Sequence, residues 1–212
     1  MIVDAGFFNE WSIKGHRYGQ CMVHPDGNLM YVNIPKNASS WTKPNLLDFN
    51  WKDSNYYDCQ LNAHALVVLR DPVDRWVSGI AEYFALYHTN FNTWTSNIFD
   101  LVFERVCFDD HTELQVKFIH GLDTSKCTFL MCDANYRSRF SSIIQEYHGN
   151  NNYNKYAYQH VSEQDPVRKE FKKIFKDAIS EPKYLSQIKN YFEADYHLIN
   201  SVKFYEPRQL NR

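Results

Sequence analysis

One stretch of the chain, from Tyr31 to Trp41, carries residue types that could hold an anion. A short apolar run ends at a proline, and Lys36 and a turn of small polar residues follow before a helix-like segment, Thr42 to Phe49. A strand, a loop and a helix in this order direct unpaired backbone N–H groups and the positive end of the helix dipole at one point. Lys36 adds a full charge, and Ser39 and Ser40 add hydroxyl donors. We therefore expect this loop to hold a phosphate or sulfate group.

A second group of polar residues follows the apolar run Ala65–Leu69. A continuous β-favouring run of this kind is typical of a parallel strand covered on both faces. Arg70 comes next, Asp71 precedes a proline as a helix cap would, and Ser78 falls in the helix that should follow. Because ligands of open parallel sheets bind beyond the carboxyl ends of the strands, we expect Arg70 and Ser78 to hold a second anionic group of the same ligand.

The elements that must position these residues alternate between strand and helix patterns, which predicts an α/β sheet with right-handed crossovers. Leu29–Ile34 is expected to be the second arm of a hairpin. Cys127–Cys132 is the third candidate core strand. Helical spacing of apolar residues recurs at 72–84, 95–107, 136–147, 168–179 and 184–192.

Two details of the expected helices bear on the site. If Ser40 caps the first of them, Pro44 falls where an intrahelical N–H is needed, so we expect that helix to start later or to be distorted. In the helix after Pro72, the apolar residues form one stripe, and Arg75, Ser78 and Glu82 are predicted to lie on another face.

Composition limits the class of protein. A chain of 212 residues with 44% apolar and 23% charged residues fits one globular domain, 1–212. A formal net charge of −2 argues against a nucleic-acid partner. No apolar run approaches the roughly 18 residues of a membrane span, and the first residues do not resemble a signal peptide. Five cysteines without a CxxC spacing indicate reduced thiols, and hence a cytoplasmic location.

Taken together, these motifs resemble those of sulfotransferases that use 3′-phosphoadenosine 5′-phosphosulfate (PAPS). Ile34–Trp41 resembles their 5′-phosphosulfate loop, and Val68–Ser78 resembles their 3′-phosphate motif, in which an arginine and a serine lie eight residues apart. The Asp-His pair and the glutamine of Asp110–Gln115 resemble a weaker signature of the carbohydrate sulfotransferase branch. Asn190–Tyr196 resembles the terminal Tyr-x-x-Asp helix of that branch.

The resemblance implies a P-loop-like three-layer α/β fold with a central, mainly parallel sheet flanked by helices. It implies transfer of the sulfuryl group of PAPS to a hydroxyl of a small-molecule or oligosaccharide acceptor, with a carbohydrate or glycolipid as the expected class. Adenosine 3′,5′-bisphosphate would be the product, and no metal is implied. The residues that would bind PAPS are Pro35, Lys36, Asn37, Ala38, Ser39, Ser40, Trp41, Arg70 and Ser78.

Two residues receive catalytic roles. Lys36 would stabilise the charge that develops on the leaving oxygen. His111 is the first choice for the base that takes the acceptor proton, because imidazole titrates near neutrality. His64, Asp48 and Asp58 are the alternatives, since several members of the family place the base between the two main motifs.

Two other functions fit parts of the pattern. A P-loop kinase or other NTPase is disfavoured because the sequence Gly-x-x-x-x-Gly-Lys-Ser/Thr is absent and the second strand ends in Arg70 rather than in a magnesium-binding acid. A non-catalytic nucleotide-binding module of the same fold is the second alternative. The chain also departs from the family at Asn37-Ala38, where many members have glycine, so the loop should adopt positive φ less freely.

Overall fold

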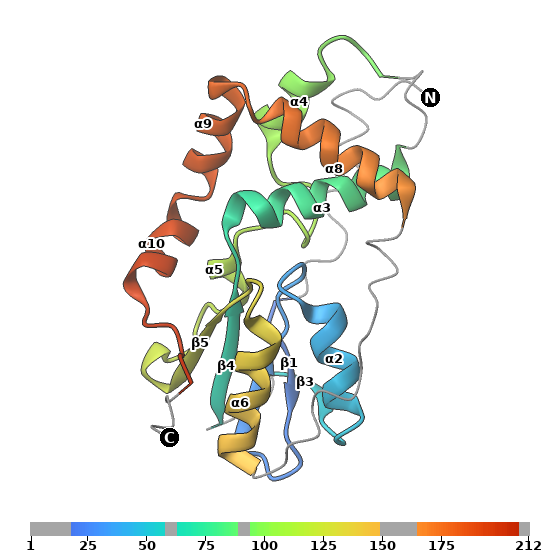
Figure 1. Cartoon of the computed structure of the whole chain (residues 1–212). Helices are drawn as coiled ribbons and strands as arrows, with labels where there is room; N and C mark the ends of the chain where they lie inside the picture. The colour runs from blue at the N-terminus through green and yellow to red at the C-terminus, as the bar shows by residue number, and fades with distance from the viewer. Residues whose placement is uncertain (1–17, 58–62, 89–93, 149–164, 208–212) are drawn as a thin grey trace. The chain divides into compact units, whose positions relative to one another are not determined.

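The computed structural model describes residues 18–57, 63–88, 94–148 and 165–207, and the chain divides into two compact units (Figure 1). One, called here the sheet unit, comprises the described residues 18–57, 63–70, 118–148 and 199–207. The other, the helical unit, comprises 71–88, 94–117 and 165–198. The single domain expected from chain length stays a prediction.

The sheet unit is built on five strands in the order β3-β1-β2-β4-β5. Their bounds are Gln20–Val23 for β1, Leu29–Val32 for β2, Lys52–Asn55 for β3, His64–Leu69 for β4 and Cys127–Met131 for β5. Strands β2, β4 and β5 are parallel, whereas β1 runs antiparallel to both β2 and β3. The prediction of an α/β fold is confirmed, with a mixed sheet whose three-stranded part is parallel.

The predicted hairpin is confirmed by the pairing of β1 with β2. The turn is closed by the N–H of Gly27 donating to the carbonyl of His24, at 2.8 Å. Gly27 has a φ of 77°, a conformation that costs glycine little and other residues more. Glycine at this position therefore suits the tight connection between β1 and β2.

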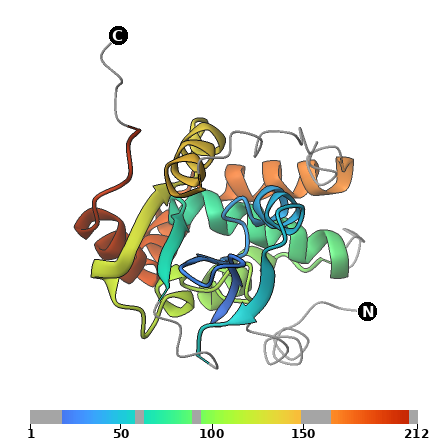
Figure 2. The same ribbon diagram turned by 90° about the horizontal axis from the view of Figure 1, so that it is seen from below.

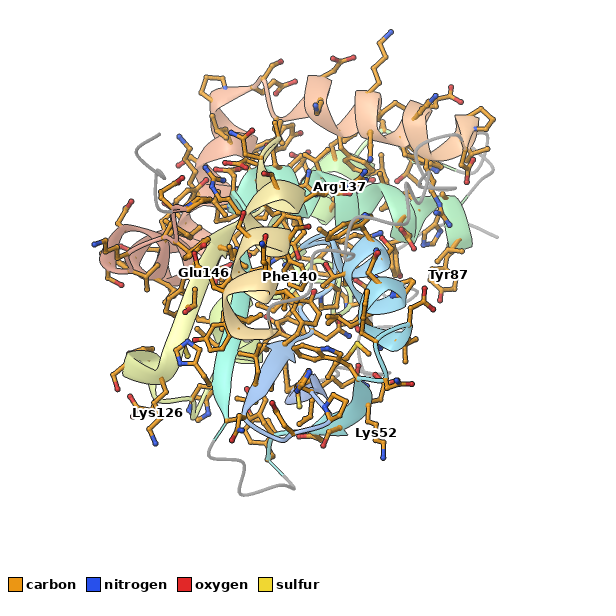
Figure 3. All side chains as sticks on the ribbon, turned by 60° about the horizontal axis from the view of Figure 1, so that its bottom comes forward. Lys52, Tyr87, Lys126, Arg137, Phe140 and Glu146 are labelled. Atoms are coloured by element: carbon orange, nitrogen blue, oxygen red, sulfur yellow. The ribbon has the colours of Figure 1, made fainter. Side chains whose placement is uncertain are left out.

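Helices α2 (Ser39–Leu47) and α6 (Tyr136–His148) pack on one face of this sheet (Figure 2). Their apolar side chains form a continuous core with residues from β1, β2, β4 and β5. Phe140 of α6 is completely buried in this core (Figure 3). Arg137 lies at the start of α6, and Lys52 and Lys126 lie at the opposite end of the sheet (Figure 3).

Helix α2 begins earlier than expected. Its N-cap is Ala38, not Ser40, and Pro44 lies inside the helix. Pro44 has no N–H to donate to the carbonyl four residues before it. Side chains supply additional bonds in the same turns, because the hydroxyl of Thr42 donates to the carbonyl of Ala38 at 3.0 Å and Nδ2 of Asn45 donates to the carbonyl of Trp41 at 2.6 Å. Tolerance of the internal proline is consistent with these two bonds.

The helical unit contains α3 (Pro72–Tyr87), α4 (Ile98–Arg105), α8 (Pro166–Ala178) and α9 (Pro182–Tyr191), and α3 and α8 lie side by side (Figure 1). Helices α5 (Gln115–Phe118) and α10 (Glu193–Ser201) each span a point where the chain passes from this unit to the sheet unit. A short 3₁₀ helix, Thr124–Lys126, precedes β5. Within the described ranges, no helix has the length and apolar character needed to cross a bilayer.

Helix α3 confirms most of its predicted pattern. Asp71 caps it by accepting from the N–H of Asp74 at 2.9 Å, and Pro72 is the first helical residue. The apolar stripe is buried. The placement of Arg75 away from the core was wrong, because its side chain is completely buried. Two backbone carbonyls of a neighbouring loop accept from the Arg75 guanidinium, which is how the charge is accommodated.

Candidate functional site

The loop between β2 and α2 holds an unusual backbone conformation. Lys36 and Ala38 have φ values of 67° and 59°, a region that residues with a Cβ seldom occupy. Asn37 between them is completely buried, and its Nδ2 donates to the carbonyl of Val68 at 2.7 Å. From the sequence we expected that residues other than glycine would adopt positive φ less freely here. The buried amide of Asn37 ties the loop to β4 and thereby supports this conformation.

Arg70 lies beside this loop. Parallel pairing sets Val32 of β2 against Val67 of β4, so the two strands end next to each other. Arg70 follows the end of β4, and its Nη1 donates to the carbonyl of Lys36 at 3.1 Å. Both side chains are half-buried. The two positions that the sequence singled out after separate strands therefore meet at the carboxyl edge of the parallel strands, where ligands of open α/β sheets bind.

The start of α2 offers donors to this edge. Among the residues that the structure describes, the backbone N–H groups of Ala38 and Ser39 make no hydrogen bond. The hydroxyl-bearing residues Ser39 and Ser40 are half-buried and exposed, respectively. Two unengaged N–H groups at the positive end of a helix, with a lysine next to them, are suited to an anion.

Trp41, the last residue of the predicted loop, is packed in the core of the sheet unit, and its part in ligand binding stays a prediction. It is 2% exposed, and its ring packs edge-to-face against those of Tyr136 and Phe140. Its backbone N–H already donates to the carbonyl of Ala38 at 3.0 Å. The guanidinium of Arg137 lies over the same ring, 5.5 Å from its centre. In this unit Trp41 anchors α2 to α6.

The other predicted residues, Ser78 and His111, belong to the helical unit. His111 lies in the loop between α4 and α5, and the backbone of this loop rests directly on α3. A Cβ added at Gly79 would lie 2.3 Å from the carbonyl oxygen of His111, so only glycine allows this approach. Ser78, half-buried, is the residue before Gly79. Within this unit, the two predicted site residues thus come from adjoining segments.

This contact gives a direct test. Replacing Gly79 by alanine should lower the free energy of unfolding by about 1–3 kcal/mol, because the added methyl group overlaps a backbone atom that cannot rotate away. Urea unfolding monitored by circular dichroism would measure the change. Ser78→Ala, on the same turn of α3, is the control and should change it by less than about 0.5 kcal/mol. Equal stabilities of Gly79→Ala and wild type would contradict the close approach.

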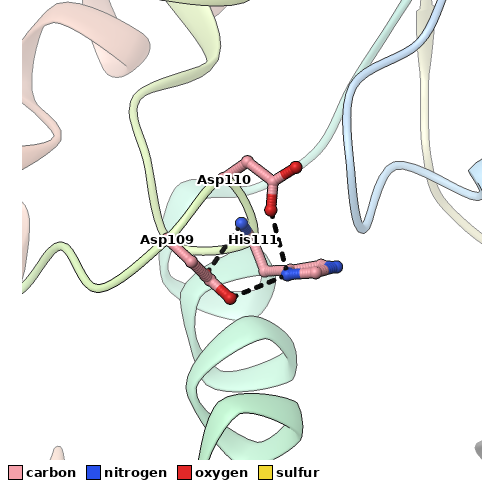
Figure 4. A group of neighbouring side chains, drawn as sticks. All are labelled: Asp109, Asp110 and His111. Atoms are coloured by element: carbon pink, nitrogen blue, oxygen red, sulfur yellow. Dashed lines mark hydrogen bonds and ion pairs between the residues drawn. The ribbon is translucent and has the colours of Figure 1, made fainter. Parts of the chain in front are cut away.

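The imidazole of His111 is held by two neighbouring carboxylates (Figure 4). Its Nδ1 lies 2.9 Å from Oδ2 of Asp109 and 3.2 Å from Oδ1 of Asp110. Burial on its own would raise the pKa of Asp109, but the hydrogen bonds from His111 outweigh burial and leave that pKa below its ordinary value. Asp109 is therefore ionised at neutral pH. The second ring nitrogen of His111 is turned away from both carboxylates (Figure 4).

The same three side chains were considered as cation ligands. Their nearest ligand atoms lie within 4.8 Å of one another, and no other trio of acidic, histidine or cysteine side chains in the described ranges is as close. The facing atoms are, however, already paired with each other by hydrogen bonds. We assign no metal to them.

The alternative bases lie less favourably. His64 is the first residue of β4, at the end of the strand opposite Arg70, and its Nε2 is 2.8 Å from the hydroxyl of Thr128. Burial lowers the pKa of His64. Asp48 follows the last residue of α2 and so lies at the far end of that helix from Lys36. Asp58 lies outside the described residues.

Asp195 was not among the predicted site residues, yet it organises the segment after His111. Asp195 is completely buried, and its two oxygens accept from the backbone N–H groups of Gln115 at 2.9 Å and Val116 at 3.0 Å. Burial raises the pKa of Asp195, although these two hydrogen bonds act in the opposite direction. A sequence signal was present, since Asp195 lies in the segment Asn190–Tyr196 that resembles the terminal helix of the carbohydrate sulfotransferase branch.

Comparisons of the chain with protein-family models, with curated protein sequences and with solved structures found no match. Functional inference therefore rests on the residues described above and on their geometry.

Proposed function

We propose that this chain is a PAPS-dependent sulfotransferase with a P-loop-like sheet, which transfers a sulfuryl group to a hydroxyl of a carbohydrate or glycolipid. One observation carries the proposal: Arg70 donates to the carbonyl of Lys36 at the adjacent ends of β2 and β4. The segment that resembles the 5′-phosphosulfate loop and the segment that begins the 3′-phosphate motif thus adjoin each other. A ligand with two anionic groups suits such an arrangement.

The proposed reaction assigns a task to each group. The acceptor oxygen forms a bond to sulfur, and the bond between sulfur and the bridging phosphate oxygen breaks. The electron pair stays on that oxygen, so adenosine 3′,5′-bisphosphate leaves. Lys36 and the N–H groups of Ala38 and Ser39 stabilise the negative charge that develops there. Arg70 and Ser78 hold the 3′-phosphate, and His111 takes the acceptor proton; the parts of Ser78 and His111 come from the resemblance.

A reducing, cytoplasmic location is part of the proposal. None of the four cysteines among the described residues forms a disulfide. Burial raises the pKa of the Cys107 and Cys127 thiols to about 11, so neither has the character of a reactive thiolate. Both observations agree with a packing role for these side chains.

The test is a comparison of two ligands. Adenosine 3′,5′-bisphosphate should raise the melting temperature of the chain more than ATP with Mg²⁺, since a ligand at a hundred times its dissociation constant adds about 2.7 kcal/mol of stability.

Lys36→Ala should abolish transfer of labelled sulfate from PAPS and retain part of the nucleotide binding. Lys43→Ala is the matched control, because Lys43 pairs with Asp53 at 3.0 Å on α2 and β3.

Each rival function predicts its own outcome. Preferential stabilisation by ATP with Mg²⁺ would refute the sulfotransferase and favour a kinase or other NTPase. Binding of PAPS without transfer to any of a broad panel of sugars, phenols and lipids would favour a non-catalytic module. If Lys43→Ala loses sulfate transfer as severely as Lys36→Ala, the loss is not specific to Lys36, and the assignment of the loop between β2 and α2 to the sulfuryl group is wrong.

A further inference from the structure

We propose that Asp109 is a positioning residue that holds His111 with its hydrogen on Nδ1, so that Nε2 is the atom that accepts a proton from the acceptor hydroxyl. This inference deepens the proposed function and rests on it for the identity of the reaction. It adds a residue that the sequence motifs do not mark, and it assigns the tautomer of the base.

The hydrogen bonds of Asp109 determine the tautomer. Its Oδ1 accepts from the backbone N–H of His111 at 2.9 Å, and its Oδ2 lies 2.9 Å from Nδ1 of the same residue. An ionised carboxylate can only accept, so the ring nitrogen that faces it must carry a hydrogen. In a neutral imidazole the other nitrogen, Nε2, then has the lone pair. Both oxygens of one carboxylate thereby fix the place and the orientation of the ring.

Further charged groups belong to the cluster around Asp109 and His111. Asp110 adds a second carboxylate at 3.2 Å from Nδ1. Arg75 of α3 donates to the backbone carbonyl of Asp110, and Asp195 of α10 acts electrostatically on Arg75. Burial lowers the pKa of Arg75 to about 10, although these three carboxylates oppose the shift, so Arg75 stays charged at neutral pH. Asp109 and Asp110 are the two carboxylates that contact the His111 ring, so an imidazolium formed there has both as ion-pair partners.

The loop that carries Asp109 and His111 is held by contacts with several helices. Helix α3 holds it through the guanidinium of Arg75, which donates to the carbonyls of Asp110 and Glu113, and through the close approach at Gly79. Farther along, the hydroxyl of Tyr191 on α9 donates to Oε1 of Glu113 at 2.9 Å, and Nζ of Lys117 lies 3.0 Å from its Oε2. A base must be held in one orientation to act, and these bonds hold the segment around His111.

In the reaction, the proton of the acceptor hydroxyl passes to Nε2 of His111 as the acceptor oxygen bonds to sulfur. The imidazolium that results is paired with Asp109 and Asp110. Release of the proton to solvent after the sulfate ester leaves restores the neutral ring. These steps need no oxidant, metal or further reactant.

The test combines a spectroscopic and a kinetic measurement on the full chain. Nitrogen-15 NMR of histidine-labelled protein, with His111 assigned by its loss in His111→Gln, should show a protonated Nδ1 and an unprotonated Nε2. In Asp109→Asn, the amide group can donate to Nδ1 and so favours the opposite tautomer. We expect kcat to fall about 10²–10⁴-fold, the range for a lost general base, with the dissociation constant of adenosine 3′,5′-bisphosphate unchanged. Asp109→Glu should recover part of the loss.

The matched control is Asp110→Asn. In the wild type the carboxylate of Asp110 lies farther from the ring than that of Asp109, and it does not accept from the backbone N–H of His111. It should keep the wild-type tautomer and lower kcat less than tenfold. A wild-type tautomer in Asp109→Asn, or an unchanged kcat, would overturn the positioning role. If wild type transfers no sulfate, the proposed function fails, yet the NMR comparison still decides whether Asp109 sets the tautomer.

Discussion

Replacing Arg75 by methionine should lower the free energy of unfolding by about 3–5 kcal/mol, the loss typical when one partner of a buried charged group is removed. The side chain is completely buried, and its two terminal nitrogens donate to the carbonyls of Asp110 and Glu113. Methionine fills much of the same volume but leaves both carbonyls without that donor and leaves buried Asp195 without a nearby cation. Chemical denaturation with urea would measure the loss.

The control for this prediction is Arg168→Met in the same unit. Arg168 is only partly buried and pairs with Asp165 at 3.3 Å and more distantly with Glu82 at 3.9 Å. Partly exposed pairs contribute about 0–1 kcal/mol. If Arg75→Met and Arg168→Met lose similar stability, the hydrogen bonds from Arg75 to the two carbonyls contribute little. The view that Arg75 fixes the loop around His111 would then be wrong.

Replacing Arg70 by alanine should weaken binding of adenosine 3′,5′-bisphosphate by about 2–5 kcal/mol, as expected when a cation is removed from a phosphate group. Part of the loss follows from the hydrogen bond to the Lys36 carbonyl, because Arg70 also supports the loop. Arg70→Lys should bind with intermediate affinity, since lysine keeps the charge but lacks the fork that binds phosphate with two hydrogen bonds. Isothermal titration calorimetry would measure the dissociation constants.

Arg137→Ala provides the comparison for Arg70. Its guanidinium also lies in the sheet unit, but over the ring of Trp41. An exposed contact of this kind contributes about 0.5–1 kcal/mol, and we expect nucleotide affinity to change little. An unchanged affinity in Arg70→Ala, or equal losses in both variants, would refute the assignment of Arg70 to a phosphate.

The elements that the sequence predicted well are those whose pattern is local. The apolar run of β4 is buried along its length because parallel neighbours flank it on both edges, as its composition indicated. Asp71 and Pro72 form the predicted start of α3, since capping depends on residues within one turn. Helix α2 starts earlier than expected and contains Pro44, next to side-chain bonds from Thr42 and Asn45 to the backbone that no propensity rule anticipates.

The errors and omissions in the site have a common physical cause. Arg75 was assigned to another face because it lies at helical spacing from Ser78 and Glu82, off the apolar stripe. Only the fold brings two carbonyls of a loop to its guanidinium. Asp195 bonds Gln115 across 80 positions of sequence, a separation that spacing rules cannot bridge. The orientation of the His111 ring depends on which oxygen of Asp109 faces Nδ1, a detail of rotamers that adjacency in sequence does not contain.

The division of the chain into two units also has a consequence for synthesis on the ribosome. Neither unit is a continuous piece of chain, because the described chain leaves the sheet unit after Arg70, re-enters it at Phe118 and returns to it at Ile199. The last return supplies Tyr205, whose N–H donates to Phe129 of β5 at 2.8 Å and whose hydroxyl donates to Glu146 of α6 at 2.6 Å. Residues that complete the sheet unit thus emerge after those that complete the helical unit, so vectorial synthesis favours completion of the helical unit first.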